Sequence, residues 1–477
     1  MADQGTGAGA PPAVPPSARV AVVLATAAAH ATSFAGQLQF DDFAVIEGDA
    51  RVQSLGAWWA SMPGIRPLLK LTYALDHQLG WGLPGQHAVN LAVHVAAALL
   101  ALALLDRLGR RLRPALPPTA AVVGALLFAL HPVQVEAVTY VSGRSSALCG
   151  ALSLASLLAH VAGRERGSWV RVYLLSPALM VLALGVKEGA LAVPPALLLC
   201  EALDRRPGRS WRAALGSTAV HWLVLAGGAA LLLGSPVYAR MMTRSLALRG
   251  PLANLLTHAE ATLWLAGQLV RPHRLVADPA LRAVLAPDAA SVAALAALGL
   301  LAALALAGLR RRAGGGAAVA GFAVLWFLLW LAPQGWWLPR PEPASERQLY
   351  LALLGPAWAA AVALHAVALR SSAVRAGVAA LLLALGVVTA VRSQVYRDEV
   401  TFWSDVVEKA PHNPRAHANL GWALAHACRP EEAEAALREA LRLDPSDVRS
   451  AVNLRLLREG VLLGADEAAR CAVPAQP

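Results

Sequence analysis

The chain has 477 residues, of which 57% are hydrophobic and only 15% are charged, and its mean hydropathy is +0.52. Soluble globular proteins carry about 25% charged residues, so this composition excludes an ordinary soluble enzyme or binding module. The formal net charge is +11, but the sequence lacks the basic patches with interleaved aromatic residues that nucleic-acid binding requires. Arginines in loops between membrane spans explain the positive charge better.

A Gly/Ala/Pro-rich segment, residues 1–18, opens the chain, and we expect it to be a disordered tail. Eleven apolar runs follow. About 20 apolar residues cross a bilayer core of roughly 30 Å, and a long series of such runs excludes a single signal peptide. The sequence therefore predicts an all-α, polytopic membrane helix bundle of about 11 spans over residues 19–391. The runs are 20–40, 86–105, 119–130, 145–163, 172–186, 189–200, 213–239, 289–309, 313–339, 348–369 and 376–391.

Arginines cluster in every second gap between these runs, at residues 107–113, 164–171, 205–212, 310–312 and 370–375. Cytoplasmic loops carry an excess of Lys and Arg, so this pattern predicts a cytoplasmic N-terminus and, after eleven spans, a C-terminus outside the cytoplasm. An odd number of spans requires that segment 254–270, which contains His258 and Glu260, does not cross the membrane. We therefore interpret it as an interfacial or re-entrant helix. The outer loop that then contains this segment has six arginines that the bias does not explain.

Hydropathy drops after Val391, and residues 392–465 indicate a tetratricopeptide-type helical domain. Segment 413–446 has the small and apolar positions of a 34-residue helix pair, and Pro445 ends its second helix. One repeat is too short to fold alone, so we expect it to pack on 396–410 and on the membrane domain. Peptide binding and a purely structural role both stay open, and the final residues, 466–477, are expected to be a disordered tail.

Four cysteines, Cys149, Cys200, Cys428 and Cys471, have no metal-ligand spacing. We interpret them as small buried hydrophobic residues. The sequence also lacks a Walker loop, a GxGxxG motif in its strand context, HExxH and GxSxG. No bound cofactor is predicted.

The first outer loop is predicted at about residues 38–85, and Asp41 and Asp42 lie near its start. Adjacent acids at a membrane exit are costly unless they are solvated or used. One of them could be a general base whose pKa is raised by its neighbour and by partial burial, whereas a solvated helix end is the alternative. The pair could also bind a divalent cation, but no third ligand is evident and we predict no metal site.

Other charged residues are predicted to reach the same membrane face. Arg and Lys can hold a phosphate, and a carboxylate can take a proton from an attacking hydroxyl, so a lipid-linked phosphosugar suits this set of groups. Two alternatives stay open: the adjacent acid–base residues could be local ion pairs, and His131 could cap a helix. The residues are His131, Glu136 and Arg144 after the third run, Lys187 and Glu188 between the fifth and sixth, and Glu346 and Arg347 before the tenth.

Several segments, in this order, resemble the transmembrane and tetratricopeptide-repeat O-mannosyltransferase family, which belongs to the GT-C class of membrane glycosyltransferases. The resemblance covers roughly residues 20–450. The segments are FDDFAVI, RPLLKLTYALDHQLGWGLPGQHAVNLAVH, FALHPVQVEAVTYVSGRSSAL, KEGAL, SERQLYL and YRDEVTFWSDVVEKAPHNPRAHANLG.

The resemblance implies a polyprenyl-phosphate sugar donor and inverting transfer to a hydroxyl of a protein or glycan on the extracytoplasmic face. It implies that Asp41 or Asp42 is the base or its orienter, and that Arg347, Lys187 and His131 contact the donor phosphate. Supporting positions are Glu188, Glu346, Arg144, Arg66 and Glu136. The composition suggests a bacterial relative in the inner membrane, with the C-terminal domain in the periplasm.

The chain departs from the family in two places. Eukaryotic members have long repeat arrays, whereas this chain has little more than one repeat, and Gln348 separates the recurrent Arg from Leu-Tyr. A non-catalytic membrane scaffold whose working part is the repeat segment is therefore the alternative function. A transporter is a third reading, although no inverted repeat is apparent.

Overall fold

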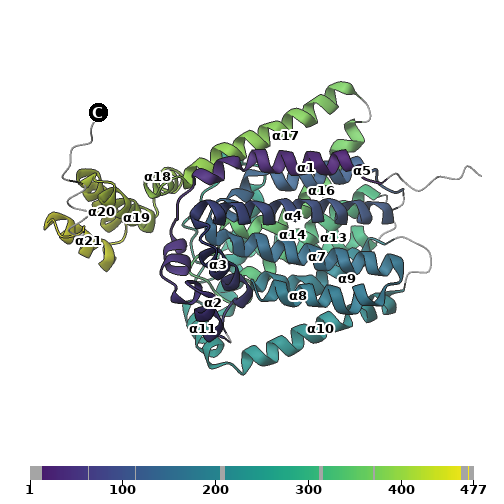
Figure 1. The fold of residues 1–477 in the computed structure, drawn as a ribbon, viewed down its shortest axis with the longest axis horizontal. Helices are drawn as coiled ribbons and strands as arrows, with labels where there is room; N and C mark the ends of the chain where they lie inside the picture. Colours follow the sequence, from purple (N-terminus) through teal and green to yellow (C-terminus); the bar gives the residue numbers. More distant parts are fainter. Residues whose placement is uncertain are drawn as a thin grey trace, which may run out of the picture.

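The computed structural model describes residues 13–62, 64–112, 114–204, 210–310, 315–368, 371–463 and Cys471. Across these ranges the regular structure is entirely helical, which confirms the all-α fold. Most of the helices lie side by side in one bundle, and four C-terminal helices, α18 to α21, extend from one end of it (Figure 1). The predicted tails lie outside the described residues except for 13–18, where α1 already begins at Pro16, and for Cys471.

Over the residues that the structure describes, each of the eleven apolar runs lies mainly on helices. Seven helices are long and apolar enough to cross a membrane, or up to nine if each of two bent helix pairs is one span. The seven are α1 (Pro16–Ala29), α4 (Gly82–Arg111), α7 (Arg144–Arg166), α10 (Trp211–Leu233), α13 (Ala289–Arg310), α14 (Gly315–Leu331) and α17 (Ser372–Ser393). The bent pairs join α5 (Pro118–Leu130) to α6 (Val135–Val138) and α15 (Leu349–Ala352) to α16 (Leu354–Ala368).

Two of the expected runs form shorter helices, namely α8 (Ser176–Leu184) and α9 (Val193–Ala202). The segment that decides the topology lies on α12 (Pro251–Gln268), which packs against α13. Helix α12 is not among the helices that are long and apolar enough to span. The count of about 11 spans thus depends on the two short helices.

The two ends of the bundle differ in chemistry. At one end the last turns of α4 and α7 bring Arg107 and Arg111 to Glu165, and Arg164 lies 3.6 Å from Glu201 at the end of α9. The opposite end carries the short helices α2 (Leu55–Ala60), α3 (Pro67–Gln78) and α11 (Pro236–Leu248) together with the C-terminal helices (Figure 1). The arginines at the ends of α4 and α7 therefore lie at one end of the bundle, away from the acid pair.

Helix α5 breaks at His131-Pro132, and the break is satisfied by side chains from other segments. Pro132 has no N–H, and the N–H groups of Val133 and Gln134 turn back to the ring Nδ1 and the carbonyl of His131. The three carbonyls thus released, at residues 128–130, would be costly if they stayed unpaired in a membrane. They accept from Gln134, from both His30 and His94, and from Thr389, at 2.7–3.2 Å.

The C-terminal domain consists of α18 (Glu399–Lys409), α19 (Pro414–His426), α20 (Pro430–Leu443) and α21 (Val448–Arg458). Helices α19 and α20 form the expected pair, in which a Cβ at Gly421 would lie 2.7 Å from the Leu437 side chain. Helix α18 packs its Phe402 and Trp403 against Tyr396 and residues of the membrane domain. The domain therefore depends on the bundle, as its size requires.

The interpretation of the cysteines is correct for two of them and wrong for the other two. Cys149 and Cys200 are buried and free, whereas Cys428 and Cys471 form a disulfide across 43 residues of sequence. Cys428 is exposed at the turn between α19 and α20. A spacing of that length gives no sign of pairing in a single sequence, because only the fold brings the two residues together.

We predict that Cys428→Ser destabilises the C-terminal domain by about 2–4 kcal/mol, because a disulfide restricts the unfolded chain and a lone repeat is marginally stable. Limited proteolysis of the full chain in increasing urea would measure this loss as earlier cleavage after α18. A reductant should bring the native protein to the same midpoint and leave the variant unchanged. Equal midpoints without reductant would show that the disulfide does not support the domain.

Candidate functional site

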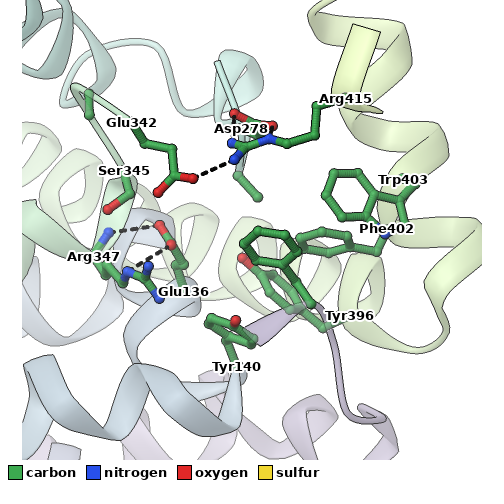
Figure 2. A pocket seen from close by; sticks show the side chains of 13 residues that line it. Glu136, Tyr140, Asp278, Glu342, Ser345, Arg347, Tyr396, Phe402, Trp403 and Arg415 are labelled. Carbon is green, nitrogen blue, oxygen red and sulfur yellow. Dashed lines mark hydrogen bonds and ion pairs between the residues drawn. The ribbon is translucent and has the colours of Figure 1, made fainter. Parts of the chain in front are cut away.

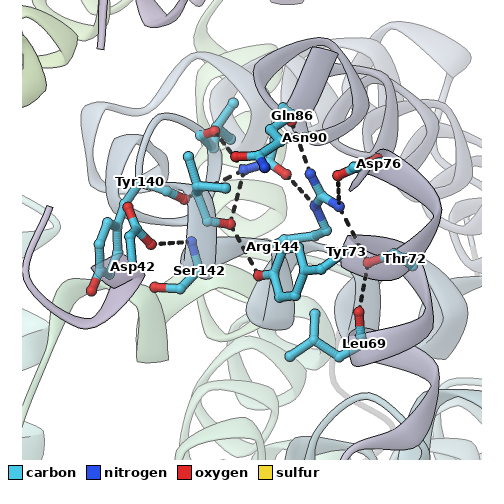
Figure 3. A network of polar contacts seen from close by, with 12 residues as sticks. Asp42, Leu69, Thr72, Tyr73, Asp76, Gln86, Asn90, Tyr140, Ser142 and Arg144 are labelled. Carbon is cyan, nitrogen blue, oxygen red and sulfur yellow. Dashed lines mark hydrogen bonds and ion pairs between the residues drawn. The ribbon is translucent and has the colours of Figure 1, made fainter. Parts of the chain in front are cut away.

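The two acids of the first outer loop have different surroundings. Asp42 is fully buried, and its carboxylate accepts the backbone N–H groups of Ser142 at 2.7 Å and Gln39 at 3.1 Å (Figure 3). Burial raises the pKa of Asp42 to about 6, although these hydrogen bonds oppose the shift. Asp42 therefore holds the loop in place and has no oxygen directed at a substrate.

Asp41 is the acid that stays accessible. Its side chain is 41% exposed and its carboxylate lies 3.5 Å from the guanidinium of Arg347. Its backbone N–H donates to the hydroxyl of Tyr140 at 2.8 Å, which fixes the main chain at this point. An exposed carboxylate beside a cation, at the end of a membrane bundle, is suited to take a proton from a hydroxyl.

Arg347 is held by Glu136, which the break in α5 places at this end of the bundle. The Glu136 carboxylate accepts the backbone N–H of Arg347 at 2.8 Å and lies 3.6 Å from its guanidinium (Figure 2). The guanidinium also lies 5.7 Å from the centre of the Tyr140 ring. Glu136 and Arg347 are thus partners across 211 residues of sequence.

A small cavity of about 30 Å³ adjoins this pair. Charged side chains lie on one side of it, and the rings of Tyr396, Phe402 and Trp403 lie on the other (Figure 2). Its lining comes from the first outer loop, α6, the loops that follow α12 and α14, and the C-terminal domain. The cavity therefore lies at the junction of the two domains.

Lys187 and Glu188 form a second group of charges near the first. The Lys187 ammonium donates to the hydroxyl of Ser146 at 2.7 Å, and burial lowers the pKa of Lys187 to about 7. Glu188 binds Arg66 at 2.9 Å and also binds Arg340. Burial alone would raise the pKa of Glu188, but the two guanidiniums hold it below its usual range. Glu188 thus joins the first outer loop to the loop after α14.

Glu346 is fully buried and lies 3.6 Å from Arg392, which in turn binds Asp405 of α18 at 2.6 Å. Adjacent residues of a helical turn point in different directions, so Glu346 and Arg347 serve different partners. The same holds for Lys187 and Glu188. The hypothesis of local ion pairs is therefore wrong for both, because each acid is paired with a guanidinium from another segment.

His131 and Arg144 lie away from the cavity. The ring of His131 accepts from the Val133 N–H at 3.1 Å and donates to the carbonyl of Leu269 at 3.1 Å, so it caps the break in α5. Both of its nitrogens are occupied. The structure thus favours the helix-cap hypothesis over a phosphate contact.

Arg144 is completely buried in a network between α3, α4 and α7 (Figure 3). Its guanidinium donates to Asp76 at 2.5 Å, to Asn90 at 2.6 Å and to the carbonyl of Gln86 at 3.1 Å, and it lies over the ring of Tyr73. All of these partners lie in the first outer loop or at the start of α4. Arg144 therefore anchors that loop to the bundle.

Sequence reasoning missed several residues of the site. Among the residues that the structure describes, no group of three His, Cys, Asp or Glu side chains gathers as a metal site would require. The missed residues share long-range partners, which a single sequence does not reveal. They are Tyr140, Asp278, Arg340, Glu342, Arg392, Tyr396 and Arg415.

Comparisons with known proteins identify a repeat and a group of similar proteins. The sequence model of the tetratricopeptide repeat matches residues 414–447, on α19 and α20. Protein O-mannosyl-transferase TMTC4 of Mus musculus is 32% identical over 184 residues, which are 33% of this chain and 25% of the relative. The predicted resemblance is confirmed.

Two further relatives give the same result. Protein O-mannosyl-transferase TMTC4 of Homo sapiens is 33% identical over 27% of this chain and 21% of its own length. Protein O-mannosyl-transferase Tmtc2 of Drosophila melanogaster is 34% identical over 33% of this chain and 16% of its own. The chain thus spans a quarter or less of the length of the curated relatives it matches, and its bacterial origin stays a prediction.

We predict that Arg144→Met destabilises the protein by about 3–5 kcal/mol, because it leaves the buried Asp76 carboxylate without its cation. Thermal unfolding in detergent should show this as a large fall in Tm. Arg282→Met is the matched control, since Arg282 forms an exposed ion pair with Glu260 and should leave Tm unchanged. Equal Tm values for both variants would mean that Arg144 does not anchor the first outer loop.

Proposed function

We propose that the protein is a membrane glycosyltransferase that moves a sugar from a polyprenyl-phosphate donor to an acceptor hydroxyl, with inversion at the anomeric carbon. The observation that carries this proposal is the exposed Asp41 carboxylate beside Arg347, which Glu136 holds at the end of the bundle. The names of the relatives, all protein O-mannosyl-transferases, support the same class of reaction. We further propose that the bundle is of the GT-C type.

In this mechanism the donor phosphate takes the place of Asp41 as the partner of Arg347. A guanidinium binds a phosphate through paired, charge-assisted hydrogen bonds, and Asp41 is then free to act as the base. The acceptor oxygen attacks the anomeric carbon, its proton passes to Asp41, and the bond to the phosphate oxygen breaks. The polyprenyl phosphate leaves with the bonding electrons, and the configuration inverts because attack comes from the opposite face.

Asp42 is assigned a positioning role. Its carboxylate accepts the N–H of Ser142, and the N–H of Asp41 donates to the hydroxyl of Tyr140, so these two bonds tie the turn that contains Asp41 to the Tyr140–Ser142 segment. Lys187 is assigned to the donor phosphate, because its buried ammonium lies near Arg347. Desolvation lowers the pKa of Lys187, and the positive charge of Arg347 lowers it further. His131 receives no such role, since both ring nitrogens already have partners.

The orientation is part of the proposal. Disulfides persist in oxidising compartments and are rare in the cytosol, so the Cys428–Cys471 bond supports a C-terminal domain outside the cytoplasm. The site and this domain lie at the same end of the bundle, and the arginine-rich helix ends lie at the other (Figure 1). With positive-inside bias, both observations favour a reaction on the extracytoplasmic face, in a bacterium the periplasmic face.

A membrane-anchored scaffold is the second candidate function. Val448 and Val452 of α21 are exposed, and they line a hollow at the turn between α20 and α21 that a partner protein could contact. This hollow lies at the turn before α21, whereas Asp41 lies in the first outer loop. Mutation of Asp41 and Asp42 therefore distinguishes the two functions, because only the transferase requires these acids.

We predict that Asp41→Asn lowers sugar transfer by about 10²–10⁴-fold, the usual contribution of a general base, without a change in Tm. The assay would use a panel of labelled polyprenyl-phosphate sugars in membranes that contain equal amounts of each variant. Asp42→Asn is the matched comparison, and it should lower both activity and Tm because one buried N–H loses its acceptor. Native turnover in Asp41→Asn would contradict the assignment of the base.

The lowered pKa of Lys187 predicts that kcat/KM for the donor depends on pH. A lysine with a pKa of about 7 carries its charge below that pH and loses it above, so kcat/KM for the donor should fall about tenfold as pH rises through 7. Lys187→Met should have a low kcat/KM that lacks this step. A variant that keeps the native profile would remove Lys187 from the donor site.

A further inference from the structure

The segment between α10 and α13 contains arginines that the charge bias of membrane loops does not explain. One of them, Arg282, pairs with Glu260 at 2.6 Å. Arg240 and Arg244, which both lie on α11, are exposed, and their side chains bond to no residue that the structure describes. Lys and Arg concentrate in cytoplasmic loops, so two unpaired arginines at the opposite end of the bundle require another explanation.

Helix α11 also exposes apolar side chains along its whole length. None of its residues is buried, and five large hydrophobic residues among its 13 are each 36% to 47% exposed. An apolar patch of this kind marks a contact with a membrane or with another protein. The five residues are Val237, Met241, Met242, Leu246 and Leu248.

The exposed side chains have a defined arrangement around the helix. Val237, Met241 and Leu248 form one stripe, because residues four and eleven apart lie at similar angles when a turn has 3.6 residues. Arg240 and Arg244 are four residues apart and form the adjoining stripe. Helix α11 contains no acidic residue. Arginines beside an apolar stripe are typical of a helix that lies in the plane of a membrane interface.

The preceding helix holds α11 close to the membrane surface. Only Gly234 and Ser235 separate α11 from α10, whose segment Trp211–Leu231 is long and apolar enough to cross a membrane. Helix α11 packs against α10 and lies at the end of the bundle that carries α2 and the C-terminal helices (Figure 1). A helix joined so closely to a span cannot leave the region of the lipid headgroups.

We propose that α11 lies in the membrane interface at this end of the bundle and that Arg240 and Arg244 bind the phosphate groups of anionic phospholipids. Val237, Met241 and Leu248 would then contact the acyl chains. Charge complementarity selects this partner, because a guanidinium binds phosphate oxygens through charge-assisted hydrogen bonds. Arginine side chains are long enough to reach the headgroups from a helix whose apolar stripe is covered by lipid.

The C-terminal end of α11 is bound to a loop of the candidate site. The hydroxyl of Ser245 donates to the carbonyl of Pro339 at 2.5 Å, and the guanidinium of Arg249 donates to the carbonyl of Arg340 at 2.6 Å. Arg340 in turn binds Glu188. A phospholipid surface that holds α11 therefore also holds the loop after α14, which carries Arg340.

The first experiment measures where α11 lies. Cys149 and Cys200 are buried and the other two cysteines are bonded to each other, so Met241→Cys gives the full chain one reactive thiol for a fluorophore. Lipids with brominated acyl chains should quench this fluorophore strongly in vesicles of phosphatidylcholine with phosphatidylglycerol and weakly in phosphatidylcholine alone. High salt should reduce the difference, because it screens the headgroup charge. A fluorophore on Thr243→Cys, across the helix from Met241, is the matched control and should not be quenched.

The second experiment removes the two arginines in the Met241→Cys background. Each arginine near an anionic surface favours the bound state by about fivefold. The combined variant Arg240→Gln, Arg244→Gln should therefore shift the equilibrium of α11 about 25-fold away from the membrane, and quenching with phosphatidylglycerol should fall to the level in phosphatidylcholine alone. Arg282→Gln is the matched control, since Arg282 lies in the same segment but pairs with Glu260. It should keep the native quenching.

Transfer kinetics test the connection to the loop after α14, and this part rests on the proposed function. In the native protein kcat/KM for the donor should be about two- to fivefold higher with phosphatidylglycerol than without it, up to the contribution of one arginine. The variant without Arg240 and Arg244 should have the same kcat/KM in both kinds of vesicle. A native protein that shows no such difference would overturn the connection and leave the lipid contact to the quenching data.

The remaining outcomes identify what covers α11. Equal quenching with and without phosphatidylglycerol would overturn the anionic phospholipid as the partner, and so would quenching that appears only with polyprenyl phosphate at equal charge. A thiol at Met241 that is protected from a water-soluble maleimide but not quenched would indicate a protein contact and overturn the interface position. Native quenching in a protein that transfers no sugar would overturn the transferase and keep the lipid contact.

Discussion

The break in α5 is the constraint on which the rest of the site depends. A membrane helix can stop at a proline only if other groups take over the hydrogen bonds that it gives up. Here the released carbonyls at residues 128–130 are bound by side chains from three other segments and from the turn itself. The break is therefore built into the packing of α1, α4 and α17, and its product is a short helix that brings Glu136 to the end of the bundle.

The charge of Glu136 determines which residues surround it. A buried carboxylate requires a cation and hydrogen-bond donors, and Arg347 supplies both through its guanidinium and its backbone N–H. Arg347 then has one face left, toward Asp41 and the cavity. The neighbouring residue Glu346 points the opposite way and binds Arg392, so one helical turn joins the site to the C-terminal domain. The adjacent residues Glu346 and Arg347 thus serve the attachment of the C-terminal domain and the candidate site, respectively.

The sequence alone predicted much of the fold, because lipid imposes a requirement that composition reveals. Uncharged runs mark the helices, and the arginines at the ends of α4 and α7 meet at one end of the bundle. It also singled out Asp41 and Arg347 as candidate site residues, because adjacent acids at a membrane exit are costly unless used and because the family resemblance assigns Arg347 to the donor phosphate. It could not predict their pairing, nor contacts such as the one between Arg415 and Asp278, because these residues lie far apart in the sequence. His131 shows the opposite case: it was a candidate for the donor phosphate, but both of its ring nitrogens already have partners in the fold.

This geometry assigns the single repeat a structural role at the candidate site. A long array binds a partner on the concave surface formed by many stacked repeats, and one helix pair has almost no such surface. What one pair can provide is a small number of side chains held at a fixed position. In this protein the bundle positions the pair through α18, the disulfide ties its turn to the C-terminal end of the chain, and Arg415 binds it across the cavity. The repeat is therefore better understood as a wall of the candidate site than as a separate binding module.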